Sequence, residues 1–497
     1  MTMTSITENT STINKNQPRW LIATAGLALF WVIFLWNFWE RGIYALGINA
    51  TVFLVLVLAL FLQSLHATRR LAVCDLFWIA PFIIIAASYA LYDNQFWKIT
   101  SLIVVPVIFV VFYVQAFTPA NTRWTLTFFG RIAVHCFSII KYFGTVSEGY
   151  ISLVAPNKAT RRRMLIRIII GLTILIIISV TVIIPLLASA DTAFKTAVDT
   201  VYQWLQKFIS LSFWYRALVF IILSLLFAAA LFAWNQLFKT KETKDTVQLL
   251  DPIISGIVLG GILVLYLLFL GIQFNHLWIG KLPFDFRETE QLVKSGFWQL
   301  LFLSVLNIVI YFFVYKKTVP AVQYVLTAFT GASLLLLASA GYRMGLYVTY
   351  YGLSYEKFFA SYAVLYCAIL FAWLITKLFA HTPADILKFI TLLFLWMYAL
   401  VAISPVEQFI LRTNVALAKR PDSRIRLFEM TMLSSDVLKT VKYYNQTGRL
   451  QENTSYLAQK DQSFDWQPWI ERQEQQIKDK SWYEYNLMNI LSRSGKY

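Results

Sequence analysis

The sequence predicts an all-α, polytopic helical integral membrane protein with about eleven transmembrane helices, interfacial amphipathic helices and a C-terminal helical tail. Composition is the first observation: 58% of the 497 residues are hydrophobic and only 14% are charged, whereas a soluble domain carries about 25% charged residues. The second is length, since many apolar runs reach the roughly 20 residues that cross a hydrocarbon core. Such runs are too long for barrel strands, and lipid offers no other partner to backbone groups.

The N-terminal segment, residues 1–18, is polar and rich in Thr and Asn, which predicts a disordered cytoplasmic segment. It does not begin a cleavable signal, because the next apolar run is too long and no small-residue cleavage site follows it. Apolar runs then recur along the chain. The predicted spans are 20–39, 43–65, 71–91, 97–117, 164–188, 216–238, 252–275, 297–315, 320–340, 356–379 and 385–404.

The spacing of these runs divides the chain into parts. We expect a four-helix membrane part at 19–120, a cytoplasmic amphipathic and basic loop at 121–163, a membrane core of about seven spans at 164–404, and a tail at 405–497. The tail differs in composition, being highly charged with spaced aromatic residues. Helical tails of this sort bind proteins more often than they catalyse reactions.

Orientation follows from the distribution of Lys and Arg. One set of alternate segments holds about nineteen basic residues, and the opposite loops hold about ten. We expect the protein to lie in the plasma membrane. The positive-inside rule then places its N-terminus in the cytoplasm. An odd number of spans leaves the tail on the extracytoplasmic side.

The stretch IIPLLASADTAF (183–194) ends the fifth predicted span without a basic anchor. In the following residues, apolar side chains recur at steps of four and three, with charged residues on the other face. This pattern predicts an amphipathic helix over 191–210 that lies in the outer interface. Asp191 is placed to cap that helix; an ion or proton site at Asp191 is the less favoured alternative.

A second amphipathic segment, WTLTFFGRIAVHCFSIIKYFG (124–144), is predicted to lie on the cytoplasmic surface and leads into a cluster of arginines. Basic clusters beside a membrane attract anionic headgroups. The candidate anionic-lipid contacts are Arg131, Lys141, Arg161, Arg162 and Arg163. The alternative is that these charges only fix topology. The net charge of +17 is attributed to such loops, because no nucleic-acid-binding motif accompanies it.

Polar residues near the outer ends of several spans suggest a pocket. Its candidate residues are Gln273, Asn275, His276, Asn307, Arg343 and Tyr347. Arg343 and Tyr347 share a helical face if the helix continues past Gly341. The alternatives are interhelical amide hydrogen bonds and an interfacial aromatic belt with a snorkelling arginine.

Three helices are expected in the tail. VEQFILRTNVALAKR extends the last span, Ser434-Ser435-Asp436 caps the helix VLKTVKYYNQ, and IERQEQQIKDKSWYEYNLMNILSR forms a final continuous helix.

Signatures of catalysis are missing from the sequence. We find no G-x-S-x-G, H-E-x-x-H or phosphate-loop motif, and the three cysteines and four histidines are scattered without metal-ligand spacing. We therefore expect no enzyme activity, cofactor or metal. The leading hypothesis is a non-enzymatic cell-envelope protein that contacts the bilayer and binds a protein partner at its outer face through its outer helix, 191–210, and its tail, 405–497. The alternative is a carrier or channel for an uncharged or amphiphilic solute.

Several segments carry a family resemblance. They are PLLASADTAF (185–194), YLLFLGIQFNHLWIG (266–280), SGFWQL (295–300), RMGLYVTYYGLSYEKFF (343–359), MLSSDVLKTV (432–441) and SWYEYNLMNI (481–490). They resemble a bacterial family of polytopic membrane proteins of unknown function, the DUF4153/DUF4173-like group. In the fourth segment, Ser354 and Lys357 stand where Thr and Arg are usual. The resemblance implies a membrane fold and transfers no residue roles.

Overall fold

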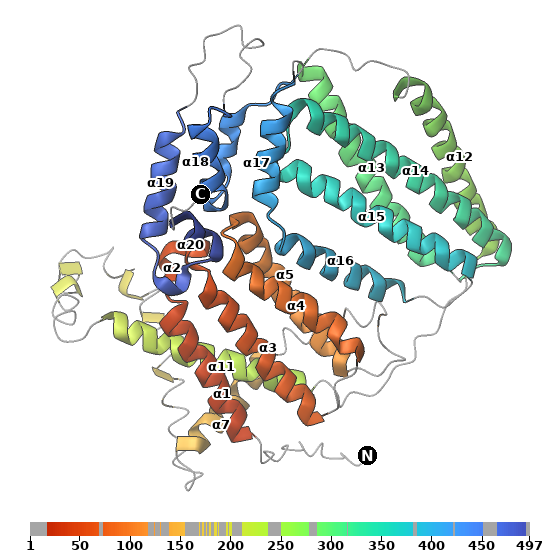
Figure 1. Cartoon of the computed structure of the whole chain (residues 1–497). Helices are drawn as coiled ribbons and strands as arrows, with labels where there is room; N and C mark the ends of the chain where they lie inside the picture. The colour runs from red at the N-terminus through yellow and green to blue at the C-terminus, as the bar shows by residue number, and fades with distance from the viewer. Residues whose placement is uncertain are drawn as a thin grey trace, which may run out of the picture. The chain divides into compact units, whose positions relative to one another are not determined.

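A computed structural model describes residues 17–68, 73–117, 139–154, 211–236, 250–277, 286–315, 317–380, 385–420, 423–450 and 465–493, together with isolated positions between 124 and 200. The regular structure of these residues is helical (Figure 1). The chain forms two compact units: residues 1–45, 52–71 and 109–241, and residues 46–51, 72–108 and 242–497.

The first unit is built on packing between α1 (Gln17–Phe34) and α11 (Leu211–Gln236). The short helix α7 (Phe143–Val154) packs against both, and Tyr150 Oη lies 2.8 Å from Thr24 Oγ1. The unit also holds α2 (Asn37–Arg41), η1 (Gly42–Ala45), η3 (Ile139–Tyr142) and most of α3 (Ile48–Thr68). Lys141 is exposed on η3.

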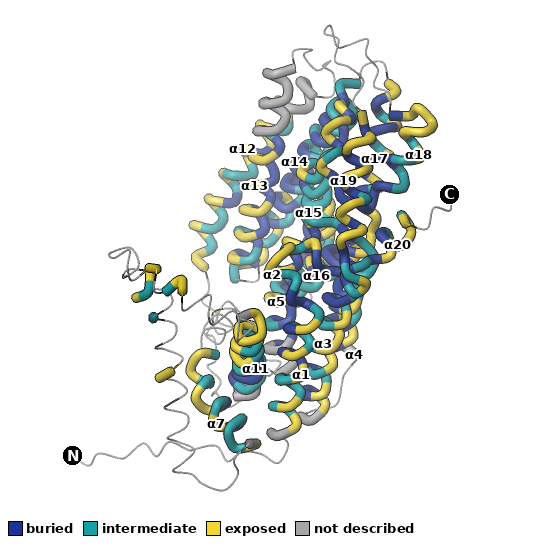
Figure 2. Tube along the Cα trace, turned by 90° about the vertical axis from the view of Figure 1, so that its left-hand side faces the viewer, coloured by how far each residue is buried: buried dark blue, intermediate teal, exposed yellow. Residues whose placement is uncertain are grey.

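The second unit contains a bundle of four long helices. They are α12 (Pro252–Leu277), α13 (Phe286–Val314), α14 (Pro320–Tyr351) and α15 (Tyr355–Ala380), and α14 contacts each of the other three (Figure 1). Phe329 and Leu337 of α14 are buried in the bundle core with Phe371 of α15. By contrast, α12 turns much of its surface outward (Figure 2), as expected of a helix that faces lipid.

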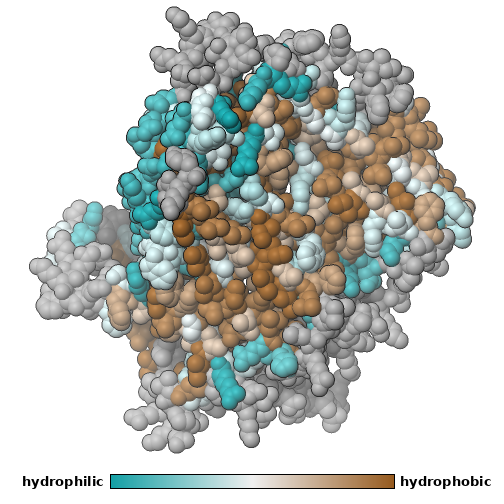
Figure 3. Space-filling view, in the orientation of Figure 1, coloured by the Kyte–Doolittle hydropathy of each residue, from teal (hydrophilic) through white to brown (hydrophobic). Residues whose placement is uncertain are grey.

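The rest of the second unit consists of further apolar helices and the tail. Helix α16 (Ile386–Ala402) packs on α4 (Val73–Leu91), which leads into α5 (Gln95–Phe117). The tail elements are α17 (Val406–Leu417), η6 (Leu427–Met432), η7 (Ser435–Val437), α18 (Leu438–Gln446), α19 (Gln467–Lys478), η9 (Trp482–Glu484) and α20 (Leu487–Arg493). Hydrophilic residues gather over α18 and α19, and hydrophobic residues over α12–α15 (Figure 3).

Seven of the described helices are long and apolar enough to cross a membrane, and nine if each of two bent helix pairs is one span. Most predicted spans correspond to these helices, but the expected count of eleven is not reached. Helix α14 continues to Tyr351, which confirms that Arg343 and Tyr347 are helical. The predicted span 164–188 and outer helix 191–210 with Asp191 lie largely outside the described residues, as do Arg131, Arg161, Arg162 and Arg163.

Two expectations about the tail were wrong. The last span does not continue into the tail, because the chain bends by 68° between α16 and α17, where Pro405 lacks a backbone N–H. The final helix is also broken between α19 and α20. There Ser481 and Glu484 form a capping box that starts the separate turn η9. The Ser434 side chain accepts a hydrogen bond from the Asp436 amide, but it caps the turn η7 and not α18 itself, which follows η7 and has Val437 at its N-cap without a side-chain hydrogen bond.

Candidate functional site

A buried ion-pair cluster joins the tail to the turn between α4 and α5. Asp93 in that turn accepts from Lys98 Nζ at 2.5 Å and from Lys480 Nζ at 2.6 Å, one ammonium group on each carboxylate oxygen. All three side chains are at least nine-tenths buried. Lys98 also donates to the Leu46 carbonyl, and Lys480 donates to Asn489 Oδ1. Residues far apart in the sequence thus share one closed polar network.

Local structure places each of these groups. Asp93 lies in a short polar turn between two apolar helices, and the Asn94 side chain accepts from the Trp97 amide to start α5. Lys98, one turn into α5, points back to Asp93. Lys480 lies where the chain leaves α19, so the break in the predicted final helix is what brings the ammonium group to Asp93.

Electrostatics keep Asp93 ionised. Burial alone would raise the pKa of its carboxyl, but the ammonium groups of Lys98 and Lys480 outweigh burial and lower this pKa to about 2. The Ser435 hydroxyl adds a hydrogen bond of 2.8 Å. Relative to a pKa of 3.8 without these partners, Asp93 therefore contributes stability above pH 3.8 that is lost as the pH falls towards 2.

Two further buried carboxylates adjoin the ion pairs. Glu407 at the start of α17 accepts from the Ser434 amide at 2.8 Å, from the Ser434 hydroxyl at 2.6 Å, and from the Tyr355 hydroxyl. Asp436 accepts from the Asp93 amide at 2.6 Å. Burial, followed by the nearby carboxylates of Glu407 and Asp93, raises the pKa of Asp436 well above its usual range. The site thus contains three carboxylates and two ammonium groups.

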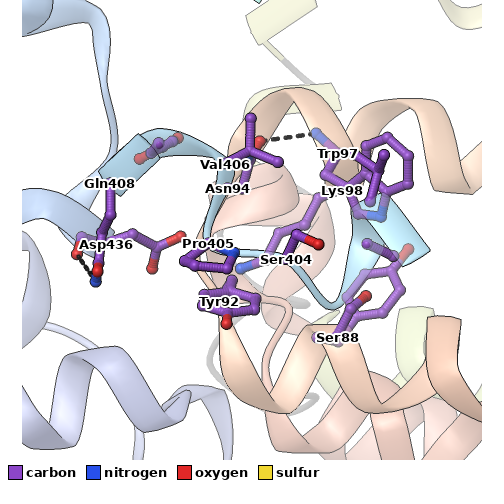
Figure 4. A pocket seen from close by; sticks show the side chains of 14 residues that line it. Ser88, Tyr92, Asn94, Trp97, Lys98, Ser404, Pro405, Val406, Gln408 and Asp436 are labelled. Atoms are coloured by element: carbon purple, nitrogen blue, oxygen red, sulfur yellow. Dashed lines mark hydrogen bonds between the residues drawn. The ribbon is translucent and has the colours of Figure 1, made fainter. Parts of the chain in front are cut away.

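A small cavity opens beside these carboxylates (Figure 4). Its volume is about 20 Å³, which suits one or two water-sized species and is too small for an organic solute. Figure 4 shows the Asp436 carboxylate directed towards Pro405 and Tyr92. The lining residues are Ser88, Tyr89, Tyr92, Asn94, Trp97, Lys98, Val401, Ala402, Ser404, Pro405, Val406, Glu407, Gln408 and Asp436.

The turn between α14 and α15 is fixed to the same tail. The Asn414 side chain of α17 accepts from the Leu353 amide at 2.6 Å and donates to the Leu353 carbonyl at 2.7 Å. Gly352 has φ +73° and ψ 172°, a conformation open essentially to glycine alone. Lys357 caps the end of α14 by donating to the Tyr351 and Gly352 carbonyls. The resembling segment 343–359 therefore encodes a turn that docks on the tail.

We expect Gly352→Ala to weaken this docking by about 1–3 kcal/mol, the usual cost of a strained backbone conformation. A Cβ at this position would also lie 2.7 Å from Asn414 Oδ1. Amide hydrogen exchange over residues 350–357 measures the effect. Gly345→Ala is the matched control, because a Cβ there meets nothing within 4 Å; equal exchange in the two variants would contradict the prediction.

Two residues of the pocket expected from the sequence, Asn307 and Arg343, lie far apart. Asn307 is buried within the bundle, where it accepts from the Tyr266 hydroxyl at 2.6 Å and donates to Ser333 Oγ at 2.9 Å. Arg343 lies ten residues after Ser333 on α14, which is about 15 Å further along the axis. Asn307 and Arg343 therefore cannot line one small pocket, and Asn307 acts as an interhelical hydrogen-bond group.

The other members of that pocket have separate surroundings. Arg343 Nη1 lies close to Gly296 of α13, where a Cβ would lie 2.6 Å from it. Tyr347 is buried, its ring lies tilted against that of Tyr351 with centroids 5.2 Å apart, and Lys357 Nζ lies over it at 4.3 Å from the ring centroid. Gln273, Asn275 and His276 belong to α12, but their side chains lie outside the described residues.

The ion-pair cluster was missed at the level of sequence. A usable signal was Lys98 placed just inside an apolar span, five residues after Asp93, because a charge there is costly without a partner. Lys480 gave no comparable signal, since it lies in a strongly charged tail. Within the described part of the chain, no group of three or more His, Cys, Asp or Glu residues could hold a metal ion.

Comparison with known proteins identifies the family. Neither the curated proteins nor the solved structures include a match to this chain. The family model described as "Domain of unknown function (DUF4153)" matches residues 79–441. This range contains Asp93, Lys98, Glu407 and Asp436, so most of the buried cluster falls inside it. Because the match covers well over half of the sequence, this chain, with its several candidate membrane spans, belongs to the DUF4153 family.

Proposed function

We propose that this protein is a non-enzymatic plasma-membrane protein whose tail, residues 405–497, forms a fixed extracytoplasmic platform for a protein partner. The observation that carries the proposal is that α20 buries a polar side chain and exposes apolar ones. Its Asn489 side chain is buried in the polar network, whereas Leu487, Ile490 and Leu491 are exposed. These three positions lie on one helical face. An apolar face turned outward on a charged tail is typical of a binding surface.

The platform has a rigid support. Trp482, immediately before α20, is 71% exposed, yet Lys480 and Asn489 on either side are fixed by buried polar contacts. The Ile48 amide also donates to the Tyr485 carbonyl at 3.1 Å. A surface held in this way loses little conformational freedom on binding, which favours affinity.

Tail contacts also support the proposed topology of about eleven spans, a cytoplasmic N-terminus and an outer tail. The turn at Asp93 contacts Lys480, and the turn at Leu353 contacts Asn414. Both turns must therefore lie on the same side of the membrane as the tail. The positive-inside count assigns all three to the outer side.

The number of membrane crossings between these two turns favours one span more than the described helices supply. Two points on the same side are joined by an even number of crossings. Among the described residues, five candidate spans separate the turns, in helices α5, α11, α12, α13 and α14. The predicted span 164–188 would supply the sixth, and with α1, α3, α4, α15 and α16 the total becomes about eleven.

Site-specific photo-crosslinking in cells tests the platform. A photoreactive residue replaces Trp482 in the full chain, and Ile490→Asp is introduced beside it. The matched control is Gln476→Asp, which adds the same charge at an exposed position of α19. We expect a discrete protein adduct at position 482 that falls at least about tenfold with Ile490→Asp, a loss of about 1.4 kcal/mol in binding, and persists with Gln476→Asp.

Adducts with lipid alone would overturn the partner proposal, because they would make α20 a membrane-facing element. A protein adduct unaffected by Ile490→Asp would also count against it. Truncation at Ser404 is a poorer test, since removal of Lys480 leaves Lys98 and Asp93 without their third charge.

A carrier or channel for an uncharged solute is the alternative. It has less support in the described residues. The polar group at mid-bundle, Asn307, has its side-chain oxygen and nitrogen engaged by Tyr266 and Ser333, and the cavity beside the charge cluster has room for one or two water-sized species only.

A further inference from the structure

The charge cluster has an unbalanced composition. Asp93 is paired with two ammonium groups, and Glu407 and Asp436 add two more carboxylates. With every group ionised, three negative charges meet two positive ones in a buried site. An uncompensated buried charge is strongly unfavourable, so the site favours a state in which one more positive charge is present.

Asp436 is the carboxylate left open to receive that charge. It is 3% exposed, and only one of its side-chain oxygens has a hydrogen-bond partner among the described residues, namely the Asp93 amide. The carboxylate lines the cavity (Figure 4), which has the volume of one or two water-sized species. Glu407, in contrast, accepts hydrogen bonds on both oxygens.

We propose that the cavity beside Asp436 and Glu407 is a binding site for one monovalent positive charge, either a proton on Asp436 or an alkali cation, and that filling this site secures the tail. The proposal does not depend on the partner-binding function above.

The site is suited to one charge and not to a divalent metal. Two carboxylates line it, and with all three carboxylates and both ammonium groups ionised the cluster has a single net negative charge. The titratable or charged groups around Asp436 come from several elements. They are Tyr92 and Asp93 of the α4–α5 turn, Lys98 of α5, Tyr355 of α15, Glu407 of α17 and, through Asp93, Lys480 after α19.

Filling the site connects to the tail through the backbone. Asp436 belongs to η7, its amide is held by Ser434 Oγ, and Ser434 in turn donates to Glu407. The Gln408 side chain donates to the Asp436 carbonyl. Repulsion between Asp436, Glu407 and Asp93 in the vacant site would therefore act directly on the η7 turn that leads into α18.

The sign of the pH dependence follows. The folded-state pKa of Asp436 is raised above 3.8 by burial and by the neighbouring carboxylates. The stability that Asp436 contributes to the folded state is fully present below pH 3.8 and is lost as the pH rises towards its folded-state pKa. Over that range the folding equilibrium constant falls by up to about tenfold per pH unit. Asp93 has the opposite dependence, so the two contributions together are greatest near pH 3.8.

Infrared difference spectroscopy on the full chain in lipid vesicles tests the proposal. The buffer is changed from low to high pH with choline as the only cation, and then from choline to Na⁺ or K⁺ at high pH. A proton site gives loss of one carboxylic-acid C=O band in the first step. An alkali site gives a shift of a carboxylate band in the second. Hydrogen exchange over 434–446, measured at fixed high pH with and without Na⁺ or K⁺, reports tail docking.

Asp436→Asn is the decisive variant, because Asn has the shape of the neutral acid and allows the tail to remain docked. We expect it to abolish the band in either step and to remove the pH and cation dependence of tail stability. Glu407→Gln is the second variant, and it should reduce the band shift if the charge is shared. Asp385→Asn is the control, since Asp385 is exposed and makes no cap hydrogen bond. Identical difference spectra for the wild type and Asp436→Asn under every cation would overturn the proposal.

Discussion

Asp93→Asn should release the tail from the membrane helices. The substitution keeps the shape of the side chain but removes the only carboxylate that pairs directly with both Lys98 and Lys480 in the described structure. Two buried ammonium groups would then face each other without a direct counter-charge. Breaking a buried ion pair by removing one partner costs about 3–5 kcal/mol, which is a large part of the stability of a typical domain.

Hydrogen exchange of residues 467–493 measures this loss, because local opening of the tail exposes the amides of α19 and α20. Asp385→Asn again serves as the control for an equal change of charge at an exposed site. Adding Lys98→Met to Asp93→Asn should recover part of the lost protection, since it removes one of the two ammonium groups that have lost their paired carboxylate. Unchanged protection in Asp93→Asn would show that the ion pairs do not hold the tail.

Gly47→Ala is expected to displace the same tail by a steric route. Gly47 lies against the backbone at the end of η9, where a Cβ would overlap the Glu484 carbonyl oxygen and lie 2.7 Å from that of Tyr485. Backbone atoms cannot rotate away as a flexible side chain can. Glu484 is also fixed by its capping box with Ser481. We expect a loss of at least about 1–3 kcal/mol, the usual cost of overpacking.

The comparison variant is Gly331→Ala in α14, where a Cβ has no neighbour within 4 Å. Removing a glycine from a helix normally gains about 0.5–1 kcal/mol, so the two substitutions should have opposite signs. Exchange of the Ile48 amide, which donates to the Tyr485 carbonyl, reports the Gly47 effect directly. Normal protection at Ile48 in Gly47→Ala would contradict the close packing described here.

The membrane helices were predictable because their length is set by the bilayer and their composition by the solvent. The run from Pro320 illustrates the limit of that reasoning. Its apolar part predicts a span to about residue 340, yet the helix continues to Tyr351 because Lys357 and Gly352 cap it there. The end of the helix is thus decided by hydrogen bonds and not by hydropathy.

The tail contacts were not predictable because they depend on pairs distant in the sequence. The segment around Lys480 has strong helical propensity, which predicts one continuous helix. The structure breaks it because burying Lys480 against Asp93 and closing the Ser481–Glu484 capping box are worth more than one helical turn. The resembling segments 432–441 and 481–490 contain Asp436 and Asn489. The motifs therefore include residues of the site, but a motif does not show which distant residues its members contact.

The order in which a ribosome makes this chain gives the Asp93–Lys480 pair a further meaning. Lys480 is made 387 residues after Asp93, a delay of about 20–80 s at ordinary rates of protein synthesis. Throughout that time Asp93 and Lys98 lack the third charge of the cluster. Completion of the site therefore reports that the intervening helices have been inserted in the right number. In the topology proposed above, a nascent chain that loses or gains one crossing places Lys480 on the opposite side of the membrane from Asp93, so this ion pair cannot form.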